Sequence, residues 1–370
     1  MRKKVIDLYA GAGGLSLGAA RAGFAVAAAV ELDAHAYAAH KLNFPHSTHI
    51  NKDVSQLSGE ALLKLAGMKK DELCGLIGGP PCQGFSEIGL SSKSDSRNEL
   101  LVDFFRLVAE TMPAFFVAEN VPGLLHPKNA PYLNRAMAQI PASYCTLPPF
   151  KVKASEYGAP TTRTRVFFVG FDPKRVNALT QESFAPRDHE DVRVRDALKG
   201  VPRIRSDWLE EEQGWRIVAK AGDTAFEKRL SGVVPEGIGD PSALKKYREQ
   251  RLVSGFLGTV HTESTIKRFR VLGHGERDTI SKAQRLNPAG YCPTIRAGTG
   301  ADRGSFQAVR PVHPSSPRVI APREAARLQG FPDWFQFHPT KWHAFRQIGN
   351  SVSPIVAESL LKVIQVAVAR

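Results

Sequence analysis

One cysteine of this chain stands where a thiol could act as a nucleophile. Cys82 belongs to the run Gly78-Gly79-Pro80-Pro81-Cys82-Gln83-Gly84-Phe85-Ser86, which directly follows the apolar residues Leu73–Ile77. Two glycines and two prolines favour a rigid, non-helical loop. We therefore expect the Cys82 thiol to lie at the carboxyl end of a sheet, where ligands of open α/β sheets bind.

The other three cysteines give no sign of similar chemistry. Cys74, Cys145 and Cys292 are widely scattered, and the chain contains no C-x-x-C pair. A zinc deaminase would need a second cysteine at position 85, which is Phe85. We therefore expect neither a disulfide framework nor a metal site.

A carboxylate and two arginines follow other apolar runs. Glu119 lies in Ala118-Glu119-Asn120-Val121-Pro122-Gly123, at the end of an apolar strand, where it could donate a proton to the ligand that Cys82 faces. Arg163 and Arg165 precede the apolar residues Val166–Val169. Two arginines two apart on a strand share one face and offer planar forks for phosphate or carbonyl oxygens.

A glycine-rich turn near the N-terminus predicts a cofactor site. The run Asp7-Leu8-Tyr9-Ala10-Gly11-Ala12-Gly13-Gly14 would bring backbone N–H groups close to a ligand. Ser16 occupies the position of the third small residue of a dinucleotide fingerprint, which favours a nucleoside cofactor without a pyrophosphate. Glu31, about 20 residues further on, could bind ribose hydroxyls, and Asp53 an adenine amino group.

The elements that must position these residues alternate along the first 170 positions. Apolar runs at 5–9, 24–30, 73–77, 114–118 and 166–169 predict strands, and 15–22, 34–42 and 100–110 predict helices. This rhythm predicts an α/β fold with a Rossmann-like, mostly parallel sheet and helices on both faces. We expect a catalytic domain of residues 1–174, completed by 344–370, and a smaller irregular domain of residues 175–343.

The distribution of basic residues along the chain indicates a negatively charged partner. The net charge of the 370 residues is +14, and residues 241–310 carry 13 Lys/Arg against 5 Asp/Glu. Such a segment suits a phosphate backbone, although a solvated basic face is an equal alternative. Asp7 interrupts what would be a signal peptide after Met1-Arg2-Lys3-Lys4, and no apolar run is long enough to span a membrane, so we expect a cytoplasmic protein.

In this order the motifs resemble those of the cytosine-C5 DNA methyltransferases. The likeness rests on the glycine-rich turn, Pro80-Pro81-Cys82-Gln83, Glu119-Asn120-Val121 and the Arg163/Arg165 pair. Residues 323–333 and 347–352 look like the last two motifs of that family, so the resemblance covers residues 5–170 and 318–365. Tyr9 and Thr161 depart from it, since the family usually has Phe and Gln there.

The resemblance implies a bacterial modification methylase with the S-adenosylmethionine-dependent methyltransferase fold and a target-recognition domain. Cys82 would add to carbon 6 of a flipped-out cytosine, Glu119 would support N3 and Arg165 would hold O2, while Arg163 would orient the cysteine loop. The methyl group of S-adenosyl-L-methionine would pass to carbon 5. The cofactor residues would be Asp7, Tyr9, Ala10, Gly11, Ala12, Gly13, Gly14, Leu15, Glu31, Leu32, Asp53, Val54, Pro80, Asn350 and Ser351.

The implied partner is duplex DNA, bound by a monomer near the nucleoid, with a restriction endonuclease acting separately. The expected DNA-binding residues are Gln83, Ser86, Arg285, Arg296, Arg303 and Arg310. Three alternatives stay open. An RNA (tRNA) cytosine-C5 methyltransferase would keep every catalytic residue. A non-catalytic DNA-binding scaffold would not need these residues. The third alternative is a nicotinamide-dependent oxidoreductase, and Ser16 counts against it because it interrupts the dinucleotide fingerprint.

Overall fold

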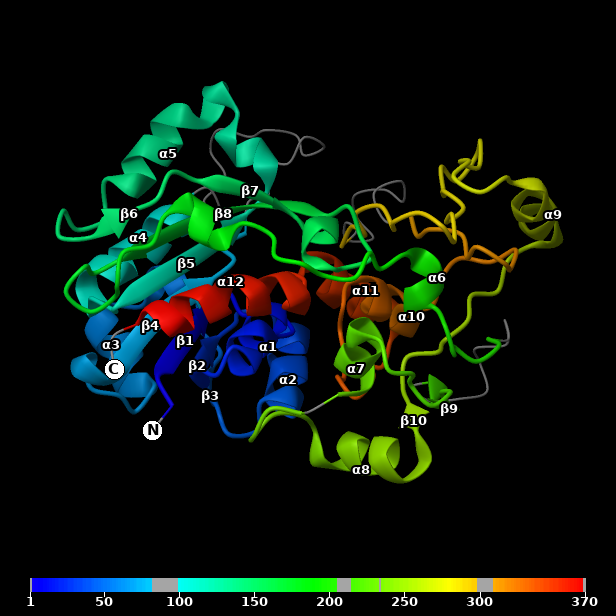
Figure 1. The fold of residues 1–370 in the computed structure, drawn as a ribbon, viewed down its shortest axis with the longest axis horizontal. Coiled ribbons are helices and arrows are strands. Elements are labelled where there is room, and N and C mark those ends of the chain that lie inside the picture. The colour runs from blue at the N-terminus through cyan, green and yellow to red at the C-terminus, as the bar shows by residue number, and fades with distance from the viewer. Residues whose placement is uncertain (1, 82–98, 205–213, 233, 298–308, 369–370) are drawn as a thin grey trace. The chain divides into compact units, whose positions relative to one another are not determined.

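The computed structural model describes residues 2–81, 99–204, 214–232, 234–297 and 309–368, and it divides the chain into two compact units (Figure 1). The sheet unit comprises Met1–Lys153, Thr164–Arg187 and Val356–Arg370, and the second unit comprises Ala154–Arg163 and Asp188–Ile355. The domain bounds expected from the sequence differ from these, and that division stays a prediction.

The sheet unit is built on strands in the order β3-β2-β1-β4-β5-β8-β6, with β7 also paired to β8. Strands β1 to β5 pair in parallel, whereas β8 runs antiparallel to its neighbours β5, β6 and β7. A mostly parallel sheet in an α/β fold is thus confirmed. The strands are β1 Lys4–Leu8, β2 Ala25–Val30, β3 Thr48–Ile50, β4 Leu73–Gly78, β5 Phe115–Asn120, β6 Cys145–Thr146, β7 Phe150–Lys153 and β8 Thr164–Phe171.

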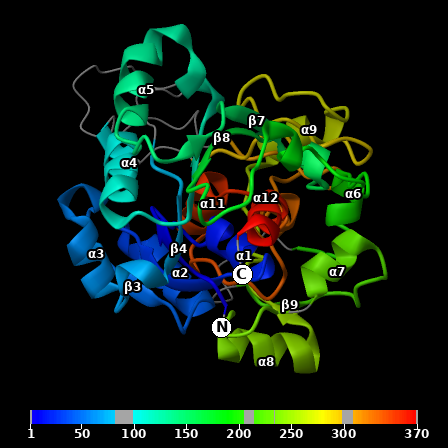
Figure 2. The ribbon, with the colours of Figure 1, turned by 60° about the vertical axis from the view of Figure 1, so that its left-hand side comes forward.

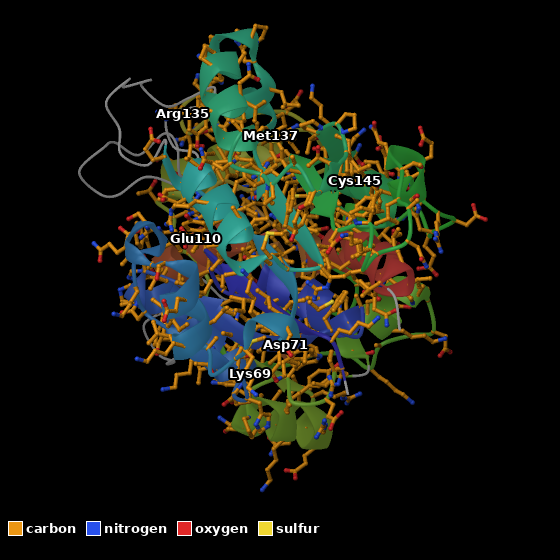
Figure 3. The ribbon with its side chains drawn as sticks, turned by 90° about the vertical axis from the view of Figure 1, so that its left-hand side faces the viewer. Lys69, Asp71, Glu110, Arg135, Met137 and Cys145 are labelled. Carbon is orange, nitrogen blue, oxygen red and sulfur yellow. The ribbon has the colours of Figure 1, made fainter. Side chains whose placement is uncertain are left out.

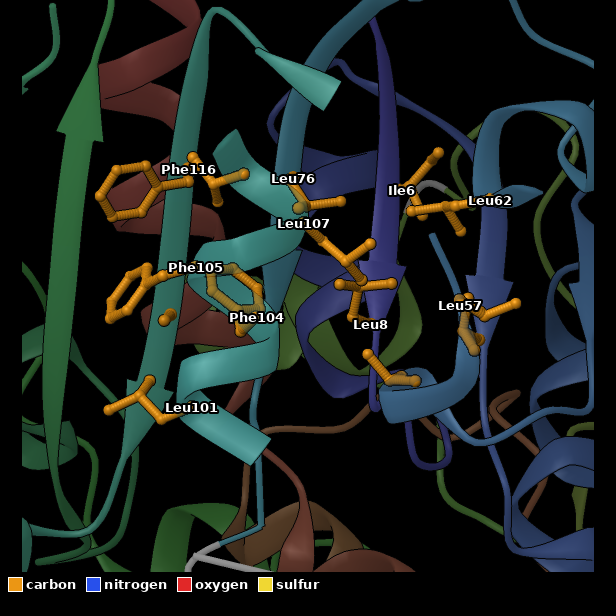
Figure 4. Packing of buried hydrophobic residues seen from close by; sticks show 14 of the residues in the cluster. Ile6, Leu8, Leu57, Leu62, Leu76, Leu101, Phe104, Phe105, Leu107 and Phe116 are labelled. Carbon is orange, nitrogen blue, oxygen red and sulfur yellow. The ribbon is translucent and has the colours of Figure 1, made fainter. Parts of the chain in front are cut away.

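Helices cover both faces of this sheet, because alternate residues of a strand point to opposite faces. Ile6, Leu8 and Leu76 pack with the apolar side of α4 (Leu100–Thr111) in a single core cluster (Figure 4). Asp7, between two of them, faces the other way and is hydrogen-bonded to a residue of α1 (Gly14–Arg21). The remaining helices of this unit are α2 Ala34–Asn43, α3 Gly59–Leu65, α5 Ala130–Met137 and α12 Pro354–Ala367.

The outer side of the α3–α4–α5 layer carries charged residues, as expected for helices with one apolar face. Glu110 at the end of α4 and Arg135 on α5 are exposed and lie on this surface (Figure 3). Both take part in ion pairs, Glu110 with Arg106 at 3.0 Å and Arg135 with Glu99. Figure 2 shows the same layer from a second direction.

The second unit has little regular sheet, and buried arginines organise it. Its strands β9 (Arg216–Ile217) and β10 (Leu252–Val253) form a two-stranded antiparallel pair. Arg323 is 1% exposed and donates to the carbonyls of Ser254, Pro332 and Phe335 at 2.7–3.0 Å. The helices are α6 Val194–Ala197, α7 Ala225–Ser231, α8 Pro241–Gln250, α9 Glu263–Val271, α10 Pro322–Leu328 and α11 Lys341–Asn350.

Among the described residues, no helix combines the length and the hydropathy that crossing a membrane requires.

Gly18 on α1 allows α12 to approach closely, and this gives a stability prediction. A Cβ added at Gly18 would lie 2.2 Å from the Cβ of Ala357 and 2.6 Å from the backbone N of Glu358. Gly18→Ala should therefore lower the free energy of unfolding by about 2–3 kcal/mol despite alanine's better helix propensity. Urea unfolding followed by circular dichroism measures this.

Gly67→Ala is the matched control, because a Cβ there meets no atom of a described residue within 4 Å and the φ of +62° is what remains unfavourable. Its cost should be about 1 kcal/mol. Equal losses in the two variants would show that α1 and α12 do not pack as closely as described.

Candidate active site

A buried ion pair joins the ends of two neighbouring strands. The Nε of Arg165, the second residue of β8, lies 2.8 Å from Oε1 of Glu119, the penultimate residue of β5. Their side chains are only 16% and 9% exposed. Burial lowers the pKa of Arg165 and the Glu119 charge opposes that effect. The contact is an ion pair and not a well-aligned hydrogen bond, since Glu119 Oε1 accepts no hydrogen bond of good geometry from a described residue. It keeps the Glu119 carboxylate beside Arg165 at the carboxyl end of β5.

The same strand end contacts the loop that leads to the predicted nucleophile. The side-chain amide of Asn120 donates to the carbonyl oxygen of Pro80 at 3.2 Å. A Cβ placed on Gly79 would lie 3.2 Å from Oε2 of Glu119, so a glycine at 79 lets the backbone pass against the carboxylate. Cys82 lies outside the described residues, two positions beyond Pro80.

Arg163 has a different environment from Arg165. Strand β8 begins at Thr164, so Arg163 lies outside the strand, and the expectation that both arginines share one strand face is wrong. Arg163 is 3% exposed, and its guanidinium donates to the carbonyls of Ile295 and Asn350 at 3.4 Å within the second unit. Thr161, which replaces the family's usual Gln, accepts a hydrogen bond from the Arg163 backbone N–H at 3.3 Å.

The glycine-rich turn bends sharply after β1. Tyr9, Gly11 and Gly13 all have positive φ, at 56°, 57° and 101°. Gly11 N–H donates to Oε2 of Glu31 at 2.8 Å, and Asp33 N–H donates to Oε1 at 2.7 Å. Burial nevertheless raises the pKa of Glu31. The carboxylate that follows β2 is thus fixed across the turn, as a ribose-binding group would need to be.

Other expected cofactor residues surround this turn or lie beside Glu31. The Tyr9 hydroxyl donates to the carbonyl of Leu100 at 3.0 Å. Leu32 is an exposed apolar side chain, 61% accessible, next to Glu31. Asp53 accepts hydrogen bonds from the backbone and hydroxyl of Ser55 at 3.0 and 2.8 Å. Four more expected residues are buried in or just after the turn, and one beside Asp53: Ala10, Ala12, Gly14, Leu15 and Val54.

Asp7 is buried beneath the turn, and no described residue forms an ion pair with it. Its Oδ2 accepts a hydrogen bond from Ser16 at 2.6 Å, whereas its Oδ1 has no partner among the described residues. Burial raises the Asp7 pKa to about 7, and the charge of Glu31 adds to the effect. A carboxylate kept at this cost in stability is typical of a binding site.

The two expected cofactor residues near the C-terminus belong to the second unit. Asn350 is the last residue of α11 and is exposed, while the hydroxyl of Ser351 donates to the carbonyl of Gln347 at 2.7 Å. Ser351 therefore caps the helix in the described structure.

The expected DNA-binding arginines differ in exposure. Arg296 is exposed. The guanidinium of Arg285 donates to carbonyls of Phe269, Leu272 and Pro314 at 2.9–3.1 Å, which gives it a structural use. Arg310 stacks on the ring of Phe345 at 4.3 Å, and burial lowers its pKa to about 10. Gln83, Ser86 and Arg303 lie outside the described residues.

The sequence reasoning missed two histidines near the turn. His40 on α2 and His49 on β3 are connected to Ser16, and thereby to Asp7, by hydrogen bonds of 2.9 and 3.0 Å. No short motif indicates them, because their positions are set by the packing of α2 against α1.

Comparisons with known proteins agree with the geometry. The family model described as C-5 cytosine-specific DNA methylase matches residues 3–366. The chain is 40% identical to the type II methyltransferase M.XorII of Xanthomonas oryzae, over 96% of this chain and 82% of that protein. It is 30% identical to the type II methyltransferase M.DdeI of Desulfomicrobium norvegicum, over 96% and 87%.

Solved structures include similar chains. A DNA modification methyltransferase encoded within a prophage (E. coli) is 47% identical, with a TM-score of 0.88 over 98% of this chain and 99% of that one. The Dnmt2 methyltransferase of S. pombe is 16% identical, with a TM-score of 0.64 over 98% of both chains, which shows a shared fold.

The raised pKa of Asp7 predicts a pH-dependent effect of Asp7→Asn. Between pH 4 and 7 the folded chain holds a proton on Asp7 that the unfolded chain has lost, so ionisable Asp7 makes stability fall as pH rises through that window. Asparagine cannot ionise. Asp7→Asn should therefore be stabilised relative to the parent at pH 8, by up to about 4 kcal/mol, and much less so at pH 4.

Chemical denaturation at pH 4, 6 and 8 measures this difference, with the exposed Asp71→Asn as the matched control. A difference in unfolding free energy that is the same at all three pH values would contradict the burial of an ionisable Asp7.

Proposed function

The chain belongs to the family of C-5 cytosine-specific DNA methylases and transfers a methyl group to carbon 5 of cytosine in DNA, and from this premise we propose which residues perform the reaction. Cys82 is the nucleophile, Glu119 and Arg165 act on the cytosine ring, and S-adenosyl-L-methionine is the methyl donor. The Glu119–Arg165 pair beside Gly79 and Pro80 is the observation that carries the proposal.

The described residues fit S-adenosyl-L-methionine. Glu31 is anchored to the turn at Gly11 and can accept from ribose hydroxyls, and exposed Leu32 offers an apolar surface for a flat base. Asp7 has a buried oxygen to which no described residue donates a hydrogen bond. Ser16 replaces a small residue that a pyrophosphate-binding turn would need. When bound, the cofactor supplies an electrophilic methyl group, carried on its positively charged sulfonium sulfur.

The protein's own residues must make carbon 5 a nucleophile, because the aromatic ring of cytosine is a poor one. The Cys82 thiolate adds to carbon 6 while Glu119, in its carboxylic acid form, donates a proton to N3, where negative charge would otherwise build up. N3 returns this proton to Glu119 when Cys82 leaves the ring. Arg165 keeps the Glu119 carboxylate in place and faces the O2 carbonyl. After carbon 5 has gained the methyl group, it loses its proton to a base, and the electron pair expels Cys82 from carbon 6.

Both charged groups act in a site with little water. Glu119 and Arg165 are held by β5 and β8 before any substrate arrives, so little reorganisation is needed during the reaction. Asn120 adds a tie to Pro80, which keeps the start of the cysteine loop beside the carboxylate. Arg163, whose guanidinium binds backbone carbonyls, supports the surrounding backbone and does not touch the base.

For the substrate we propose duplex DNA with a defined recognition sequence. Several relatives are named type II methyltransferases, and residues 241–310 carry an excess of eight positive charges that suits a phosphate backbone. The expected DNA contacts of Arg296 and Arg310, and those of Gln83, Ser86 and Arg303, belong to this proposal. We further propose a cytoplasmic monomer whose partner restriction endonuclease acts separately.

Two other functions are separated from this one by simple assays. An RNA methyltransferase would label tRNA and leave duplex DNA unlabelled when both are offered with radioactive S-adenosyl-L-methionine. A DNA-binding scaffold would bind DNA and label neither. Bisulfite sequencing of DNA from cells that express the protein would also reveal the modified sequence.

Cys82→Ser tests the assigned nucleophile. A serine hydroxyl is far less nucleophilic than a thiolate at neutral pH, so methyl transfer should fall by more than about 10³-fold. Affinity for duplex DNA and for S-adenosylhomocysteine should stay within about twofold. Methyl transfer to a DNA duplex and fluorescence anisotropy measure the two quantities, with Cys145→Ser as the exposed-cysteine control. Turnover in Cys82→Ser close to the parent rate would refute the assignment.

Arg165→Lys tests the electrostatic role of the ion pair. Lysine keeps the charge but lacks the planar fork that can bind Glu119 and a carbonyl together. We expect kcat to fall by about 10²-fold with little change in the affinity for S-adenosylhomocysteine.

Arg175→Lys is the matched control, because Arg175 donates to the carbonyls of Met112 and Leu73, at the opposite end of the sheet. It should lower stability and leave kcat within about twofold. An unchanged kcat in Arg165→Lys would show that Arg165 serves only to stabilise the fold.

A further inference from the structure

Four polar side chains form a continuous chain of hydrogen bonds under the glycine-rich turn. Ser16 Oγ lies 2.6 Å from Asp7 Oδ2, His40 Nε2 lies 3.0 Å from Ser16 Oγ, and His49 Nε2 lies 2.9 Å from His40 Nδ1. Asp7, Ser16 and His40 are at most 1% exposed, and His49 is half-buried at the outer end. The chain thus runs from the surface to a buried carboxylate.

The donors and acceptors of this chain follow from simple proton counting. Burial lowers the pKa of both His40 and His49, so each neutral ring offers one donor and one acceptor. Because Ser16 donates to Asp7, its oxygen accepts from Nε2–H of His40, and His40 Nδ1 is left as an acceptor. We assign the proton of His49 to Nε2, facing His40 Nδ1, and not to the side of the ring that faces the backbone of Ser47. All three hydrogen bonds therefore point toward Asp7, and each strengthens the next.

His40 also supports the turn by contact. A Cβ added at Gly13 would lie 2.4 Å from the Phe44 ring and 3.1 Å from Cδ2 of His40, so α2 lies directly against the turn. The rings of His40 and Phe44 are stacked with centroids 4.2 Å apart. The orientation of the His40 ring is thus fixed by Phe44 on one side and by two hydrogen bonds at its nitrogens.

The chain ends on a carboxylate with one unused oxygen. Asp7 Oδ1 is buried and has no hydrogen-bond partner among the described residues, which is costly for a carboxylate. We propose that Ser16, His40 and His49 are positioning residues that hold Asp7 so that Oδ1 accepts a hydrogen bond from a cationic donor of the bound cofactor, its amino-acid ammonium group. This inference rests on the proposed cofactor.

Binding of S-adenosylhomocysteine, which carries the same ammonium group, to the full chain tests this proposal by calorimetry. Ser16→Ala removes the donor to Asp7 and His40→Leu removes the next link. We expect the dissociation constant to rise about tenfold in each, while kcat at saturating cofactor changes less than about twofold. His40→Gln, which keeps an N–H for Ser16, should recover part of the affinity.

His46→Leu is the matched control, because His46 is exposed and is not part of the chain. It should bind S-adenosylhomocysteine like the parent protein. Normal affinity in folded Ser16→Ala and His40→Leu would overturn the positioning role. A parent protein that neither binds S-adenosylhomocysteine nor methylates DNA would instead overturn the proposed function, so the two failures are distinguishable.

A spectroscopic measurement on the unaltered protein avoids any loss of folding in the variants. Long-range ¹H–¹⁵N correlation spectra report which ring nitrogen of a neutral histidine carries the proton. With S-adenosylhomocysteine bound at pH 8, we expect His40 and His49 both to be protonated at Nε2. Protonation of either ring at Nδ1 would reverse the direction of the chain and contradict the proposal.

Discussion

The Glu119–Arg165 ion pair is the interaction on which the site depends. Removing two charges from water costs several kcal/mol for each ion, and only close pairing with good geometry offsets that cost. The pair forms because β8 returns antiparallel to β5 and places Phe167 opposite Glu119, with Arg165 two residues earlier. The aromatic core between these strands and α4 keeps them in register. The position of the Glu119 carboxylate, our proposed catalytic group, is thus set by the packing of β5 against β8 and α4.

Glu119 and Asp7 are both buried carboxylates near the carboxyl ends of strands, but they differ in the groups that compensate their negative charge. Glu119 has an arginine 2.8 Å away, whereas in the part of the chain that the structure describes Asp7 has a serine hydroxyl as its partner and no opposite charge. The pKa of Asp7 is correspondingly raised to about 7. An enzyme that binds a cationic cofactor gains from such a group, because the ligand supplies the missing charge. In the role that we propose for Asp7, stability is given up in exchange for cofactor binding, a common compromise in functional sites.

Much of this architecture is predictable from the sequence, because long apolar runs with regular spacing report directly on buried strands. The strands expected at 5–9, 24–30, 73–77, 114–118 and 166–169 correspond to β1, β2, β4, β5 and β8. Glu31, after β2, contacts the glycine-rich turn, and Glu119, at the end of β5, lies beside Gly79 before the cysteine loop. Strands β3, β6 and β7 were not predicted, since two to four residues give no periodic signal. The different environments of Arg163 and Arg165 could not be predicted from their spacing, because the residue at which β8 begins depends on the pairing of β8 with β7. The chain through His40 and His49 brings together residues from four elements, β1, α1, α2 and β3, and no local pattern indicates such a tertiary contact.

The most direct test of the account is the rate of covalent adduct formation on duplex DNA that contains 5-fluorocytosine, in which the fluorine prevents release of the enzyme from carbon 6. The parent protein should form a stable adduct through Cys82 in the presence of S-adenosyl-L-methionine. Glu119→Gln should form it at least about 10²-fold more slowly while binding S-adenosylhomocysteine with unchanged affinity. If the parent protein forms no adduct on its recognition sequence, or if both proteins form it at the same rate, the assigned chemistry is wrong.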